Sequence, residues 1–198
     1  SGREAAVWKL LANLALAVSA QGLREALALG AATGTPAEDV LARRYEMISS
    51  TLEAEGFEWY EVSNWSKPGG ECEHNRIYWV DGNWWGAGPG AHSHLGNERF
   101  FNVKHPSRYI EALGRDELPI KETETLTDAD RHMEKIMLGL RLREGIPETW
   151  LDAHATPALE RFIGRDLLER AGERVRITKP GRLLADGIIT DLLVAEET

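Results

Sequence analysis

The sequence has little cysteine, no long apolar run and no excess of positive charge. A single cysteine excludes an internal disulfide and favours a reducing compartment. The longest apolar run, residues 10–18, contains Asn13 and is too short to span a bilayer. The first residues also lack the order of a secretory signal. These absences predict a cytoplasmic protein without a transmembrane segment.

Negative charge dominates, with 32 acidic against 23 basic side chains and a formal net charge of −9. Phosphate backbones are bound by clustered Lys and Arg, so this balance predicts no general affinity for nucleic acid. Hydrophobic residues make up 42% of the chain, which is ordinary for a globular protein. The 198 residues suffice for one large core or for two smaller units that share an interface.

The first part of the chain has the pattern of helices followed by a strand. Residues 4–18 and 22–30 are rich in Ala and Leu and predict two short helices. Thr35 is followed by Pro and then by Glu three residues on, which predicts a helix start with a capping box. That helix should end at Gly56, and residues 57–63 then alternate as a strand. Helix followed by strand is half of an α/β unit.

The last part of the chain predicts a separate α+β unit. Residues 127–145 have the apolar spacing of a helix, a second short helix follows, and residues 156–172 predict a third. Residues 174–178 alternate as a strand, or form part of a small hairpin, before a last helix. This order is typical of a winged-helix-like unit. The predicted domains are therefore residues 1–113 and 127–198, joined by a charged linker.

A winged-helix-like unit invites a DNA-binding interpretation, which the charges of its predicted third helix oppose. Arg161, Arg165 and Arg170 are balanced there by acidic side chains, so the helix has no basic footprint. Packing as an accessory domain is favoured, and docking of a partner protein is the further alternative.

Aromatic and histidine side chains are concentrated in residues 72–94. Five of the seven tryptophans lie between residues 59 and 85, and three histidines and the only cysteine lie beside them. Large aromatics usually fill a core. A flat, apolar, metal-containing ligand, however, also needs aromatic walls, a nitrogen or sulfur ligand and a basic group for carboxylates. The stretch supplies each of these types in Tyr78 and Trp79, His74 or Cys72, and Arg76.

A glycine-rich loop, GAGPGA, covers residues 86–91. It lacks the lysine of a phosphate-binding loop and the spacing of a dinucleotide fingerprint. Its glycines let the backbone pass close to a neighbouring strand or to a ligand, and the spacing alone favours the strand. His92 and His94 would then share one face of a strand, where a metal site would need a third ligand such as Glu98.

The segment YEVSNWSKPGGECEHNRIYWVDGNWWGAGPGAHS, residues 60–93, closely resembles the corresponding segment of the haem chaperone HemW family. Those proteins belong to the radical S-adenosylmethionine (SAM) superfamily and are often labelled oxygen-independent coproporphyrinogen III oxidase-like. The most specific element is the HNxxYW pattern, which stands here at residues 74–79. The stretches NVKHP and ITKPGRLLADGII are also similar, so the resemblance covers roughly residues 37–194.

The resemblance implies the C-terminal part of a partial radical-SAM α/β barrel, followed by a winged-helix-like domain of the HemN C-terminal type. It implies a protein that binds haem and delivers it to haem-accepting proteins. The alternative is an oxygen-independent coproporphyrinogen III oxidase, a dehydrogenase of porphyrin biosynthesis. His74 becomes the candidate ligand of the haem iron. The other candidate haem-binding residues are Asn75, Arg76, Tyr78 and Trp79.

The same resemblance makes the glycine-rich loop the edge of a SAM pocket, with Gly88, Gly90, Ala91 and His92 closest to that cofactor. The family's CxxxCxxC motif, which holds a [4Fe-4S] cluster, is absent because the chain has one cysteine. The chain also opens in mid-pattern without Met, so a fragment of a longer protein is expected. SAM and the cluster are therefore expected in the longer protein, and this chain alone should be catalytically inactive.

Overall fold

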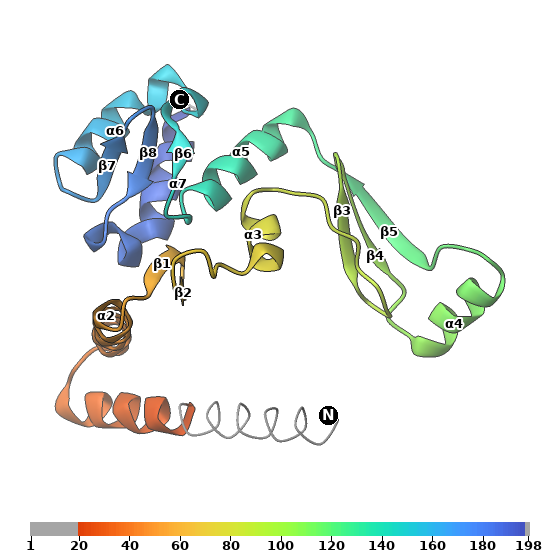
Figure 1. The fold of residues 1–198 in the computed structure, drawn as a ribbon, viewed down its shortest axis with the longest axis horizontal. Coiled ribbons are helices and arrows are strands. Elements are labelled where there is room, and N and C mark those ends of the chain that lie inside the picture. The colour runs from red at the N-terminus through yellow and green to blue at the C-terminus, as the bar shows by residue number, and fades with distance from the viewer. Residues whose placement is uncertain (1–19, 197–198) are drawn as a thin grey trace. The chain divides into compact units, whose positions relative to one another are not determined.

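The structure is a computed structural model that describes residues 20–196 (Figure 1). Contacts divide the chain into two compact units, Ser1–Gly56 and Phe57–Thr198. The helix predicted over residues 4–18 lies outside the described residues. None of the helices within residues 20–196 is long and apolar enough to cross a membrane.

In the described part of the first unit, helices cover residues 20–33 and α2 (Ala37–Ala54). The second ends as predicted, since the left-handed Gly56 (φ 74°) follows it. The predicted capping box is wrong, because Pro36 is the N-cap residue and no side chain caps the helix. The hydroxyl of Thr35 instead lies 3.2 Å from that of Thr33. The apolar face of α2 is largely exposed, with Leu41 47% accessible.

The second unit begins with an antiparallel hairpin of β1 (Glu58–Glu61) and β2 (Asn64–Ser66), which confirms the predicted strand. A short helix, α3 (Glu73–Trp79), follows and carries the HNxxYW residues. The next sheet has the order β3-β4-β5, and every pair in it is antiparallel. Its elements, with the helix that connects the last two strands, are β3 (His92–Leu95), β4 (Glu98–Asn102), α4 (Pro106–Gly114) and β5 (Ile120–Thr125).

The charged stretch around residues 114–126, which was predicted to be a linker, contains the strand β5. Residues of β5 pair with β4, with Glu98 opposite Thr125 and Arg99 opposite Glu124. The side chains of β5 are almost all exposed, so the strand carries no apolar alternation. An edge strand needs only the backbone partners that its neighbour offers, and charged side chains there discourage further pairing.

The remainder of the second unit combines helices with a sheet of order β6-β8-β7. Its α-helices are α5 (Asp128–Gly139), α6 (Thr156–Ile163) and α7 (Ala185–Glu196). Its strands are β6 (Ile146–Pro147), β7 (Leu168–Ala171) and β8 (Arg174–Ile177). Three 3₁₀ turns connect them: η1 (Glu148–Trp150), η2 (Ala153–Ala155) and η3 (Pro180–Leu184).

Two predicted helices in this region are shorter than expected. The third helix ends at Ile163, because Asp166 adopts a left-handed conformation (φ 57°) and the following residues form the β7–β8 hairpin. The helix predicted to reach Gly145 ends at Gly139, where a Cβ would come within 2.5 Å of the Ile146 side chain. Close approach of β6 therefore needs a glycine at the end of α5.

The main core of the second unit lies between this sheet and the helices α5, α6 and α7 (Figure 1). Burying each large aliphatic side chain contributes about 1.5–3 kcal/mol relative to exposure. The largest fully buried apolar side chains are Ile136, Leu140, Ile146, Leu168, Val175, Ile188 and Leu192. The C-terminal region therefore has a hydrophobic core of its own.

Candidate functional site

Helix α3 exposes one edge that carries His74 and Tyr78. The two residues are four positions apart, so their side chains lie on the same side of the helix. The hydroxyl of Tyr78 lies 3.2 Å from Nε2 of His74, and the ring centroids are 5.3 Å apart in an edge-on arrangement. Both residues are solvent-exposed, and an exposed imidazole beside an aromatic ring can accept an apolar, metal-containing ligand.

The other candidate haem-binding residues face away from this edge. Asn75 donates from Nδ2 to Oε1 of Glu61 at 3.0 Å. Arg76 forms an ion pair with Glu144 at 3.2 Å, so its guanidinium is already engaged. The structure therefore brings His74 and Tyr78 together, while these two neighbours anchor α3 to the hairpin and to the C-terminal region.

Trp79 also lies on the inner side of α3. It lines a cavity of about 90 Å³ together with Trp150 and Gly139 of the C-terminal region. This position suits a packing role at the base of the helix.

A row of aromatic rings leads from the exposed edge of α3 into the protein. The ring of Tyr78 meets Trp84 edge-on at 4.7 Å, and Trp84 meets the ring of His94 at 4.9 Å. The backbones of Trp84 and His94 also exchange two hydrogen bonds, of 2.9 and 3.0 Å. Trp84 is therefore positioned both by its backbone hydrogen bonds and by its ring contact with His94. Its ring in turn packs against that of Tyr78.

The inner end of this row is a buried polar cluster. His94 is 1% exposed, and Nη1 of Arg131 lies 2.7 Å from its Nε2. A guanidinium only donates, so Nε2 accepts and the imidazole proton is assigned to Nδ1. That nitrogen faces Oδ1 of Asp81 at 3.6 Å, and Nη2 of Arg131 lies 2.8 Å from Oδ2 of Asp81.

The predicted alternative of a metal held by His92, His94 and Glu98 is not formed. His92 is exposed and stacks on Phe101 at 5.2 Å, whereas His94 is enclosed by the polar cluster. Within residues 20–196 no three His, Cys, Asp or Glu side chains gather in a way that could hold a metal ion.

A cavity of about 310 Å³ lies beside the aromatic row, between β3 and α5. It is lined by Tyr78, Asp81, Trp84, His92, Ser93, His94, Arg99, Glu134, Met137 and Leu138. Arg99 and Glu134 form an ion pair in its wall, and the hydrogen bond that Arg99 donates to Glu134 raises the pKa of Arg99. The cavity thus brings Tyr78 of the HNxxYW pattern close to His92 of the second predicted site.

The charged residues of this region could not be predicted from the sequence. Arg99, Arg131 and Glu134 lie far along the chain from α3, on elements whose patterns indicate only an exposed strand and an amphipathic helix. No spacing rule connects them to α3. Asp81 has a weak local signal, because it adopts φ 56° directly before a glycine, as turn residues do.

The glycine-rich loop packs against a strand, which confirms the interpretation favoured by its spacing. A Cβ on Gly86 would overlap the carbonyl oxygen of His92 in β3, so only glycine fits at this crossing. Gly88 (φ 109°) and Gly90 (φ 70°) adopt left-handed conformations that other residues rarely reach.

Asn102, another residue that the sequence analysis missed, holds this loop in place. Its Nδ2 donates to the carbonyl oxygens of Gly86 and Gly88 at 3.1 and 3.0 Å. The loop amides are also engaged: Gly86 donates to Ser93 Oγ, Gly88 to Tyr109 Oη, Gly90 to Val103 O and Ala91 to Gly88 O. The candidate SAM-contacting residues Gly88, Gly90 and Ala91 therefore keep no amide donor for a ligand.

The residues present do not fit an iron–sulfur cluster. Cys72 is exposed at the start of α3, and it is the single cysteine of the chain. One thiolate cannot replace the several that such clusters require. No chemistry through a cluster is therefore derived for this chain.

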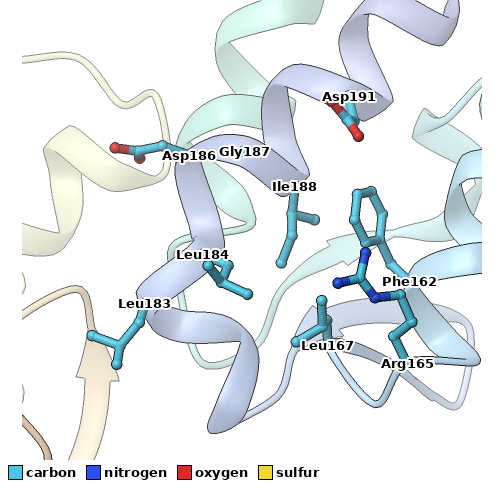
Figure 2. A pocket seen from close by; sticks show the side chains of 9 residues that line it. All are labelled: Phe162, Arg165, Leu167, Leu183, Leu184, Asp186, Gly187, Ile188 and Asp191. Atoms are coloured by element: carbon cyan, nitrogen blue, oxygen red, sulfur yellow. The ribbon is translucent and has the colours of Figure 1, made fainter. Parts of the chain in front are cut away.

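A second cavity, of about 360 Å³, lies between α6 and α7 (Figure 2). Figure 2 shows Phe162, Leu167 and Ile188 around one hollow, with charged side chains at its rim. Asp186 and Asp191 at this rim are ion-paired with arginines. None of the predicted site residues lines this cavity.

Comparison with known proteins shows that the chain is similar to haem chaperones. The chain is 48% identical over 158 residues to the haem chaperone HemW of Mycobacterium tuberculosis, which covers 80% of this chain and 40% of that protein. It is 30% identical over 161 residues to HemW of Bacillus subtilis, covering 77% and 42%. The chain is a relative of the haem chaperone HemW. It spans about 40% of the length of these HemW proteins, and the predicted resemblance is confirmed.

Residues 126–184 match the HemN C-terminal domain. A solved structure described as coproporphyrinogen III oxidase (HemN) from Escherichia coli, a radical SAM enzyme, has a TM-score of 0.54 and 18% identity to this HemW relative. It covers 78% of this chain and 40% of that one. At this identity the likeness concerns the fold, and it confirms the predicted mixed α/β class.

Proposed function

We propose that this chain is the haem-binding part of a cytoplasmic haem chaperone, which passes haem to acceptor proteins. The observation that carries the proposal is the exposed His74–Tyr78 edge of α3, set in the HNxxYW pattern of a chain 48% identical to a HemW protein. Imidazole is a common axial ligand of haem iron. His74 is therefore the proposed iron ligand, and haem is the cargo.

The side chains around His74 have two further proposed roles, contact with the porphyrin and anchoring of α3. Tyr78 and Trp84 offer aromatic surface to the flat face of a porphyrin. Asn75, Arg76 and Trp79 hold the helix against its neighbours, so that His74 stays presented to solvent. A ligand on an exposed helix edge is accessible to an acceptor protein, as delivery requires.

SAM and a [4Fe-4S] cluster belong to this proposal only for a longer protein. When bound there, the cluster and SAM would supply radical chemistry. The loop of Gly88, Gly90, Ala91 and His92 would form one edge of the SAM pocket. The alternative function, oxygen-independent coproporphyrinogen III oxidase, depends on that chemistry, and the single cysteine of this chain gives it no support.

Titration of ferric haem into the purified chain tests the proposal. We expect a saturating change in the haem absorption spectrum with the wild type, and loss of that change with His74→Ala. The matched control is His154→Ala, which removes an exposed histidine of the C-terminal region that pairs with Asp152. An unchanged spectrum with His74→Ala would remove His74 as the ligand.

A further inference from the structure

The ligand nitrogen of His74 is already occupied in the haem-free chain. Nε2 is at the far end of the imidazole, whereas Nδ1 lies next to the side chain's own Cβ and the helix. A flat porphyrin therefore reaches Nε2 with less obstruction than Nδ1. The hydroxyl of Tyr78 lies 3.2 Å from this same Nε2.

We infer that Tyr78 caps His74 in the haem-free chain and competes with the haem iron for the Nε2 lone pair, which favours haem release. The inference rests on the proposed function, in which His74 binds haem. Iron binding needs the Nε2 lone pair, so the imidazole proton is assigned to Nδ1, and in this tautomer the Tyr78 hydroxyl donates its hydrogen bond to Nε2 in the empty chain. Binding replaces this bond by the iron–nitrogen bond. On release the iron–nitrogen bond breaks and the hydrogen bond returns, with no transfer of electrons or protons.

The position of Tyr78 makes the competition effective. It lies four positions after His74 on the helix, a spacing that keeps the two side chains adjacent. Trp84 contacts the Tyr78 ring at 4.7 Å and is itself fixed by the two backbone hydrogen bonds to His94. The hydroxyl is therefore already near Nε2, and little side-chain freedom is lost when the capping bond re-forms.

The hydroxyl of Tyr78 has no second partner in the described part of the chain. The contact with His74 is its one hydrogen bond within residues 20–196. Removal of this hydroxyl consequently affects one hydrogen bond and leaves both ring contacts of Tyr78 in place.

The test compares Tyr78→Phe with the wild type in the full chain. A neutral hydrogen bond of this kind corresponds to about a 2- to 10-fold change in an equilibrium or rate. We expect Tyr78→Phe to bind haem with a dissociation constant about 2- to 10-fold lower than that of the wild type, measured by competition for haem with a haem-free globin. The absorption maximum of the bound haem should stay the same, because the iron ligand is unchanged.

A double variant isolates the pair. In a His74→Ala background, Tyr78→Phe should have no effect on residual haem binding, since the atom that Tyr78 caps is gone. Tyr45→Phe, in the first unit of the chain, is the matched control for loss of a tyrosine hydroxyl, and its dissociation constant for haem should equal that of the wild type.

Other outcomes overturn the inference in distinguishable ways. Weaker binding with a shifted spectrum in Tyr78→Phe would make Tyr78 a ligand rather than a competitor. An unchanged dissociation constant would show that the capping bond has no role. If the wild type binds haem and His74→Ala binds it identically, the proposed ligand fails. Absence of haem binding by the wild-type chain would overturn the proposed function and this inference together.

Discussion

Arg131 of α5 donates to the buried His94 of β3 across 2.7 Å. The same guanidinium contacts Asp81 at 2.8 Å and the carbonyl oxygen of Gly96 at 2.7 Å. One side chain of the segment that matches the HemN C-terminal domain thus joins the turn after α3 to the strand that follows the glycine-rich loop. Through Trp84, which contacts His94, this junction supports the ring of Tyr78 beside the proposed haem ligand.

Replacing Arg131 by Ala should destabilise the second unit strongly. The substitution leaves the carboxylate of Asp81, whose side chain is 5% exposed, without its cation, and it leaves His94 without its donor. Loss of one partner of a buried ion pair costs about 3–5 kcal/mol, and the partial exposure of Arg131 places this case near the lower value. Urea unfolding measures the change.

Arg161→Ala is the matched control for that experiment. Arg161 pairs with Asp191, and both side chains are more than half exposed. Surface pairs contribute about 0–1 kcal/mol, so this variant should unfold at nearly the wild-type urea concentration. Equal losses in the two variants would show that the contacts of Arg131 have no special role.

Replacing Asn102 by Ala should loosen the glycine-rich loop. The buried amide of Asn102 supplies hydrogen bonds to the carbonyls of Gly86 and Gly88, and each such bond contributes about 1 kcal/mol. Hydrogen exchange should therefore become faster at the amides of Gly88 and Gly90. Asn97→Ala, at an exposed position in the β3–β4 turn, should leave these exchange rates unchanged.

The start of α5 should respond to acid through one carboxylate. Asp130 accepts hydrogen bonds from the hydroxyl and the amide of Thr127, and these bonds lower its pKa. A carboxyl group whose pKa is lowered by folding stabilises the fold above its unfolded pKa, about 3.9. That contribution is lost as the pH falls through the lower, folded value.

Asp130→Asn should therefore weaken the pH dependence of thermal unfolding below about pH 4, while changing its slope little at neutral pH. Asp128→Asn, in the same first turn but outside the capping box, is the comparison. Identical acid profiles for the wild type and Asp130→Asn would contradict the assignment.

The sequence predicted those elements of the fold that are marked by residues within the element or next to it. The strand at residues 57–63 alternates as strands do, and the end of α2 is marked by Gly56. The strand β5 escaped prediction because its pairing with β4 depends on backbone partners brought by the turn of the chain around α4. The shortened third helix likewise depends on Asp166, whose left-handed conformation has no clear sequence signal.

The sequence indicated which segment carries the candidate site, but it did not indicate how the side chains of that segment are arranged. The resemblance indicated residues 74–79, but it treated them as one group around haem. The structure separates them, because Asn75 is drawn to the buried Glu61 while His74 and Tyr78 share the exposed edge. Arg131 and His94 are 37 residues apart in the sequence. A contact between residues so far apart has no signature in the local sequence pattern.

Replacing Gly86 by Ala should show that the glycine-rich loop is shaped by β3. The added Cβ would overlap the carbonyl oxygen of His92, and a backbone atom cannot move aside as a flexible side chain can. We expect a loss of about 1–3 kcal/mol in the free energy of unfolding, typical of overpacking.

Gly187→Ala is the matched control, because a Cβ there meets no atom within 4 Å and the residue lies in α7. That substitution should be neutral or stabilising, since alanine favours helix by roughly 0.5–1 kcal/mol over glycine. A Gly86→Ala variant as stable as Gly187→Ala would mean that the loop does not cross β3 at this point.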